Sequence, residues 1–171
     1  SIPEFPEKQK ILLYLVNKLN NIYFQIDSPQ LCFNVFKNFK PKSMITRFSD
    51  YPIKEQIEYR YLLGRYYLLN DRVTNAFSQL NNAYTLLTRL CEKANLFGFP
   101  QVRRNLVRIL RYLIPTGLIM GKLPKFDMIR MLDPSLAQDY YIVAKNLRAG
   151  NIREMNTWLK THEREMCERH L

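Results

Sequence analysis

Residues 57–90 read IEYRYLLGRYYLLNDRVTNAFSQLNNAYTLLTRL. Apolar residues recur every three or four positions on both sides of Asn70-Asp71, which predicts two antiparallel helices joined by a tight turn. Three small residues fall where the two helices would approach each other most closely: Gly64, Ala76 and Ala83. Two larger residues would fill the space that remains: Tyr67 and Leu80. The segment therefore predicts a closely packed helical hairpin.

The spacing of this hairpin resembles the tetratricopeptide pattern, in which Leu-Gly, Tyr, Ala, a large apolar residue and a second Ala follow one another across two helices. The residues after position 90 do not repeat the pattern, so a stack built on it would be degenerate. Stacked hairpins bury a continuous core and usually present their outer surfaces to partners.

The rest of the chain shows the same periodicity and no alternating run of β-branched residues. Helices are predicted at 7–26, 30–38, 53–69, 72–90, 101–120, 127–132, 135–149 and 152–162, with a shorter one near 43–48. Pro115 lies inside one of them and is expected to kink or break it. In the first helix the periodic residues are Ile11, Leu12, Leu15, Val16, Leu19, Ile22 and Tyr23. The predicted class is all-α, a right-handed stack of helical hairpins.

A chain of 171 residues is one domain by length, or a piece of a larger one. We expect a single helical-repeat domain over 1–171, with N-terminal helices at 1–52, the hairpin at 53–91 and further helical repeats at 92–171. The first residue is Ser1, with no leader sequence, so we expect an excised fragment.

Composition excludes several classes of protein. Apolar residues are 47% and aromatic residues 13%, which is incompatible with a disordered chain. No uncharged apolar stretch reaches about 18 residues, so no membrane span is expected. The cysteines Cys32, Cys91 and Cys167 are far apart and odd in number, which fits a reducing compartment better than a disulfide framework or a zinc site.

Catalytic motifs are missing from the sequence. The cluster His162, Glu163, Cys167 and His170 does not have the spacing of a zincin helix, because Met166 occupies the position of the second histidine. No glycine-rich phosphate loop and no nucleophile in a known setting occurs. We therefore expect no enzyme activity, no cofactor and no metal.

The chain carries 26 Lys and Arg against 15 Asp and Glu, a net charge of +11, which suits a polyanionic or acidic partner. The segment 93–125 contains no acidic residue. At 100° per residue, three arginines of the helix at 101–120 share a stripe opposite its apolar face. With their basic neighbours they form the candidate polyanion or acidic-partner face: Arg103, Arg104, Arg108, Arg111, Lys122 and Lys125. The alternative is that these arginines pair with acidic residues of neighbouring helices. The stripe has no interleaved aromatic residues, which argues against base stacking.

Three segments resemble the PCI-domain family of proteasome-lid, signalosome and initiation-factor subunits. Residues 109–115, ILRYLIP, followed by Leu118, Gly121 and Pro124, resemble its ILxYLIPxxLxxGxxP segment. Residues 61–69, YLLGRYYLL, resemble its YxLGRYxLL helix. Residues 143–152, VAKNLRAGNI, with Trp158-Leu159 resemble its A-x-x-x-G-N turn. Within this family, residues 10–21 and 58–70 look most similar to the PCI subunit of the second transcription-export complex.

The resemblance implies a helical stalk that leads into a winged helix, which is absent from this sequence. It also implies a non-catalytic scaffold in a nuclear complex that couples transcription to messenger-RNA export at the nuclear pore. The implied partners are a large PCI-bearing scaffold subunit and a small acidic disordered subunit, with RNA or DNA bound by the full assembly. A PCI subunit of a signalosome- or splicing-associated complex and a stand-alone RNA- or DNA-binding module remain alternatives.

Overall fold

The computed structural model describes residues 5–39 and 48–122. Within them the chain forms five α-helices and no strand: α1 (Phe5–Gln25), α2 (Cys32–Asn38), α3 (Ile53–Leu69), α4 (Val73–Ala94) and α5 (Pro100–Ile119). Two short 3-10 helices, η1 (Pro29–Leu31) and η2 (Phe48–Asp50), precede α2 and α3. The predicted all-α class is confirmed. The helices predicted beyond residue 122, and most of the one near 43–48, lie outside the described residues.

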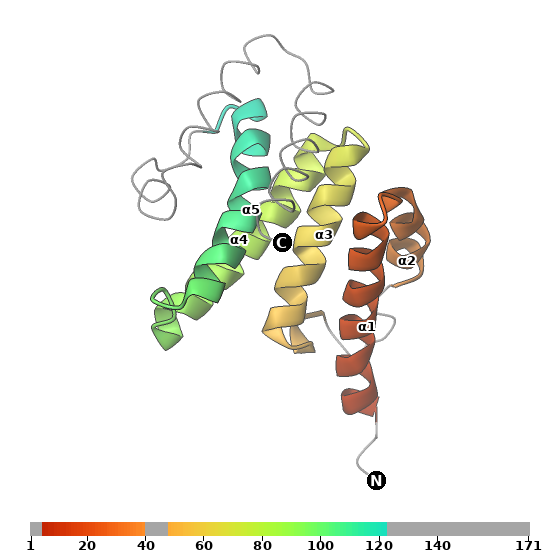
Figure 1. Ribbon diagram of the computed structural model, residues 1–171, viewed down its shortest axis with the longest axis horizontal. Helices are drawn as coiled ribbons and strands as arrows, with labels where there is room; N and C mark the ends of the chain where they lie inside the picture. The colour runs from red at the N-terminus through yellow and green to blue at the C-terminus, as the bar shows by residue number, and fades with distance from the viewer. Residues whose placement is uncertain (1–4, 40–47, 123–171) are drawn as a thin grey trace.

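The helices form a layered stack with α3 at its centre (Figure 1). One side of α3 packs against α1, which also contacts α2, and the other side packs against α4. The helix α5 packs against α4 in turn. The main core lies among α3, α4 and α5, and a second cluster around Leu13, Phe39 and Tyr51 joins α1 to the start of α3.

The α3–α4 hairpin confirms the pattern at 57–90. Ala76, Leu80 and Ala83 of α4 are completely buried. A Cβ atom added to Gly64 would lie 2.7 Å from the Leu80 Cγ, which is shorter than a van der Waals contact allows. The hairpin therefore needs glycine at this position for its two helices to reach their observed separation.

Four helices end in the same way, with one residue in the left-handed region. These residues are Asp27 (φ 56°), Asp71 (φ 59°), Asn95 (φ 53°) and Gly121 (φ 72°). In each case the next amide donates a hydrogen bond to a carbonyl five residues earlier, as from Arg72 to Tyr67 at 2.9 Å. This is the Schellman arrangement, and Asp, Asn and Gly tolerate its positive φ best. It explains why the predicted turns fall where they do.

One expectation, a break at Pro115, is corrected, and the two sides of α1 can now be assigned. The helix α5 continues through Pro115 to Ile119, so it is not broken there. The apolar residues Ile11, Leu15 and Ile22 of α1 face outward and are about half exposed. The buried side of α1 carries Leu13 and Val16 together with two asparagines.

Candidate functional site

A groove of about 360 Å³ lies over α3, between α1 and α5. Its polar wall comes mainly from α1, α3 and α5: Asn17, Lys18, Asn21, Lys54, Glu55, Glu58 and Arg108. Its apolar wall comes mainly from α4, α5 and the loop between them: Leu87, Leu90, Leu96, Val102 and Ile109. A groove with one polar and one apolar wall is suited to a peptide segment or a small polar ligand.

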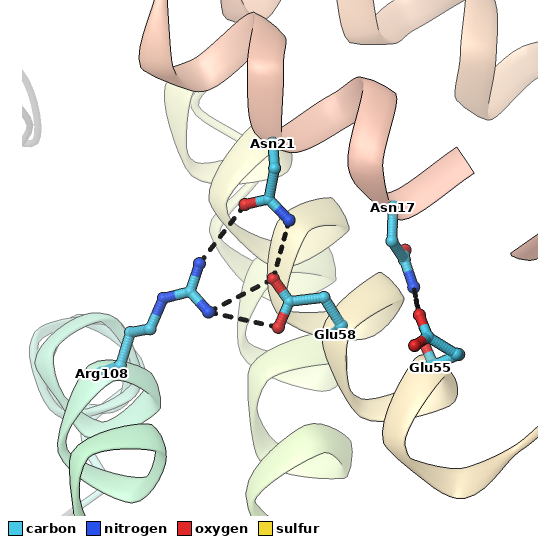
Figure 2. Close-up of polar contacts among 5 residues, drawn as sticks. All are labelled: Asn17, Asn21, Glu55, Glu58 and Arg108. Carbon is cyan, nitrogen blue, oxygen red and sulfur yellow. Dashed lines mark hydrogen bonds and ion pairs between the residues drawn. The ribbon is translucent and has the colours of Figure 1, made fainter. Parts of the chain in front are cut away.

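Arg108 of α5 connects three helices at this groove (Figure 2). Its Nη1 atom lies 3.2 Å from each carboxylate oxygen of Glu58 on α3, and its Nη2 donates to the Asn21 Oδ1 on α1 at 3.4 Å. The Asn21 amide in turn donates to Glu58 at 3.0 Å. The Arg108 guanidinium also lies 4.3 Å from the centre of the Tyr61 ring. The Arg108 side chain therefore fixes the position of α5 relative to α1 and α3.

The charge of Arg108 is secure in this setting. Burial alone would lower the pKa of the guanidinium, but Tyr61 and Glu58 raise it by more, and the net pKa of Arg108 is raised. Since arginine is already always protonated near neutral pH, Arg108 keeps its positive charge there. Arg108 therefore contributes a constant positive charge to the contact between α5, α1 and α3.

A second polar contact lies beside this network. The Asn17 amide nitrogen donates to the Glu55 carbonyl and to its carboxylate, both at 2.9 Å (Figure 2). Within the described part of the chain, the Asn17 Oδ1 is buried and has no hydrogen-bond partner. Leaving such an acceptor unsatisfied costs about 1–3 kcal/mol. The polar wall therefore contains one buried acceptor that no described group satisfies.

Arg65 was not singled out from the sequence, although it lies in the YLLGRYYLL segment. Its side chain is buried, and its guanidinium carbon lies 4.2 Å from the Phe24 ring, 5.4 Å from Tyr61 and 5.0 Å from Tyr112. These rings come from α1, α3 and α5, so Arg65 joins the same three helices as Arg108 does. The signal in the sequence was an arginine inside an otherwise apolar and aromatic helix.

The members of the predicted basic face lie in different environments. Arg108 points inward to an acidic residue of a neighbouring helix, which was the alternative explanation for the stripe. Arg111 is partly buried, and its Nε has no hydrogen-bond partner among the described residues. For Arg108 the structure therefore shows the alternative, pairing with a neighbouring acidic residue, while its side chain remains 40% exposed.

The other members of the face lie near the two ends of α5. Arg103 and Arg104 are exposed in its first turn. Lys122 is exposed just after the helix, with its Nζ 4.3 Å from the Phe77 ring centre. The two ends are roughly 27 Å apart along a helix of this length. Lys125 lies outside the described residues.

No group of three or more potential metal ligands occurs in residues 5–39 and 48–122. The cluster at 162–170, including Cys167, lies outside them. Cys32 and Cys91 are buried, and burial raises the pKa of Cys32 to about 11, so this thiol is a poor nucleophile near neutral pH. No described helix is long and apolar enough to cross a bilayer.

Known proteins were compared with the whole chain. No family model matches it. The nuclear mRNA export protein THP1 of Saccharomyces cerevisiae is 51% identical over 172 residues, which is 100% of this chain and 37% of that protein. A PCI domain-containing protein 2 homolog of Dictyostelium discoideum is 28% identical over 91% of this chain and 33% of its own length. The protein CSN12 homolog of Schizosaccharomyces pombe is 29% identical over 88% of this chain and 33% of its own length.

The chain thus spans about a third of the length of the curated relatives that it matches. Two of its three family-like segments fall largely in described helices, residues 61–69 in α3 and residues 109–115 in α5. Both contribute to the core next to the groove. The chain is similar to PCI-domain proteins, and over its whole length it resembles the nuclear mRNA export protein THP1.

Proposed function

We propose that this chain is part of a non-catalytic scaffold subunit of a nuclear complex that couples transcription to messenger-RNA export at the nuclear pore. The observation that carries the proposal is the 51% identity to THP1 across the whole chain. At this level of identity the same arrangement of helices is expected in the matched part of both proteins. The proposal treats residues 1–171 as a single helical-repeat domain of a larger PCI protein, with parts at 1–52, 53–91 and 92–171.

The proposed partners are a large PCI-bearing scaffold subunit and a small acidic disordered subunit. The net charge of +11 supports an acidic partner. Since Arg108 already pairs with Glu58, the cations open to such a partner in the described residues include Arg104 and Lys122 at the ends of α5. Lys18 and Lys54 on the groove wall are also exposed.

Co-purification tests the assembly. The full-length protein, tagged and expressed at its natural level, is expected to bring down a PCI-bearing scaffold and a small acidic protein. The paired change Arg104→Glu and Lys122→Glu should reduce recovery of the acidic protein several-fold, because two attractions become repulsions. Arg89→Glu is the matched control, because Arg89 is equally exposed but lies on α4. Recovery of the unchanged protein as a partnerless monomer would contradict the proposal.

A direct contribution to RNA or DNA binding is the second candidate. It is favoured by the acid-free segment 93–125 and by the exposure of Arg103 and Arg104. Binding through phosphates weakens steeply as salt rises. In the assembled complex, Arg104→Glu should lower affinity for single-stranded RNA and flatten the salt dependence, whereas Arg89→Glu should do neither. Equal affinities for the two variants would remove this candidate.

The similarity to the CSN12 homolog keeps a related complex as an alternative. Identifying the scaffold protein that co-purifies distinguishes the export complex from the related complex, because each predicts a different PCI partner.

A further inference from the structure

The outer face of α1, extended by the residue just after its end, carries a row of aliphatic side chains, which we call the α1 stripe: Ile11, Leu15, Leu19, Ile22 and Ile26. Their exposed fractions lie between 39% and 59%. Their spacing of four, four, three and four residues places them on one side of the helix, opposite the buried Leu13 and Asn20. Exposed apolar surface that extends over several adjacent side chains usually marks an interaction site.

The geometry of the α1 stripe selects an α-helix as its occupant. The row is straight and roughly 22 Å long, which is the form of a helix-packing seam. A membrane-surface helix would need a polar face rich in Lys and Arg, and a nucleic-acid surface would need several cations. Between Ile11 and Ile26 the only charged residue is Lys18.

Charge argues against a second copy of this chain as the occupant. Lys18 lies at the edge of the α1 stripe and near its midpoint, so an antiparallel pair of stripes would place Lys18 opposite the Lys18 of the other copy. Any pairing would also join two chains that each carry +11. The ammonium group of Lys18 lies 5.5 Å from the centre of the Tyr14 ring, which is itself 45% exposed. A carboxylate from a different protein would complement this cation and its partly apolar surroundings.

We propose that the α1 stripe is the docking surface for an amphipathic α-helix of a partner protein, with an acidic side chain of that helix next to Lys18. This inference rests on the proposed scaffold function, and it gives one partner a defined place on the molecule. The stripe lies on the side of α1 that faces away from α3, so a helix bound there adds a layer to the stack beyond α1.

Site-specific cross-linking in the assembled complex tests the proposal. The photo-reactive residue p-benzoylphenylalanine replaces Leu15 or Ile22 in the full-length protein, and Phe99 in the control. Phe99 is 58% exposed at the start of α5, away from the α1 stripe. Cross-links from both stripe positions to one helical segment of another protein, without such cross-links from Phe99, are expected.

A charge swap makes the test specific. Lys18→Glu should lower the cross-link yield a few-fold, as expected for an exposed ion pair, and changing the acidic residue of the captured helix to Lys should restore it. Cross-links that lead only to the same chain or to a second copy would overturn the proposal, as would their absence. Flotation of the protein with vesicles of phosphatidylcholine and phosphatidylserine would also overturn it, because the stripe would then be a lipid surface.

Co-purification and cross-linking of the unchanged protein together separate failure of the docking inference from failure of the proposed function. If the PCI-bearing scaffold co-purifies with the unchanged protein but no stripe cross-link forms, only the docking inference fails. If no scaffold co-purifies with the unchanged protein, the proposed function itself fails.

Discussion

Replacing Gly64 by alanine probes the closest approach of α3 and α4. The new Cβ would lie 2.7 Å from the Leu80 Cγ, 2.9 Å from its Cδ2 and 3.4 Å from the Ala76 carbonyl oxygen. Normal contacts between carbon atoms begin near 3.5 Å. Leu80 is completely buried, so it has no open space to move into. Overpacking of this kind costs about 1–3 kcal/mol.

An opposing effect reduces this cost. Alanine is favoured over glycine inside a helix by about 1 kcal/mol. We therefore expect Gly64→Ala to lower the free energy of unfolding by about 0–2 kcal/mol, measured by urea denaturation followed by circular dichroism. Gly98→Ala is the matched control, because no atom lies within 4 Å of its added Cβ. That variant should change the free energy of unfolding by less than about 0.5 kcal/mol.

A double-mutant cycle identifies the clash as the cause. Leu80→Ala alone should cost about 2–5 kcal/mol through the cavity that it leaves. In the double variant the methyl group added at position 64 enters that space without a clash, so the combined loss should be at least about 1 kcal/mol smaller than the sum of the two. Full additivity, or a Gly64→Ala protein more stable than the original, would refute the close packing of the hairpin.

Three further predictions follow from single contacts. Arg108→Met and Glu58→Gln should each lower the free energy of unfolding. A double-mutant cycle should give a coupling energy of about 1 kcal/mol, since the pair is partly exposed. A coupling energy of zero would mean that the ion pair does not hold α5 to α3. Burial raises the pKa of Cys32 from 9.0 to about 11, so the folded chain keeps a proton that the unfolded chain loses. The free energy of unfolding should therefore fall by about 2–3 kcal/mol as the pH rises from about 9 to 11. The Cys32→Ala variant should show a shallower decline in its urea midpoint over that range. Equal declines in the two proteins would exclude Cys32 as the cause. Asn95→Ala should lower the free energy of unfolding by about 1 kcal/mol, whereas Asn95→Gly should leave it nearly unchanged, because Asn95 has a φ of 53°. An alanine variant that unfolds at the same temperature as the original protein would argue against the left-handed cap.

The hairpin could be predicted because its determinants are local. Gly64, Ala76 and Ala83 set how close the two helices come, and Leu80 fills what remains, whatever else packs around them. The turns were equally readable, because Asp, Asn and Gly are the residues that accept a left-handed backbone at a helix end.

The surfaces could not be predicted in the same way. A helical wheel separates polar from apolar residues, but it does not show what lies opposite each side. The arginine stripe was expected to line the outside of its helix. Arg108 stays partly exposed, but its guanidinium contacts Asn21 and Glu58, which α1 and α3 place beside it. The apolar periodicity of α1 predicted an amphipathic helix, but it did not show that Leu13 and Asn20 would be on the buried side. Both features depend on contacts between segments far apart in the chain.

The continuation of α5 through Pro115 has a related origin. Proline removes one backbone hydrogen bond, but Pro115 and its neighbours Ile114 and Thr116 are buried, and the Thr116 hydroxyl donates to the Tyr112 carbonyl. The helix thus continues through Pro115 where that residue and its neighbours are buried, and the local sequence alone does not show that they are buried.

The distribution of polyadenylated RNA in cells is the most direct measure of the proposed role. When the full-length protein is depleted, fluorescence in situ hybridisation with an oligo-dT probe should show polyadenylated RNA accumulating in the nucleus, and re-expression should restore the cytoplasmic signal. An unchanged RNA distribution after complete depletion would contradict a role in messenger-RNA export.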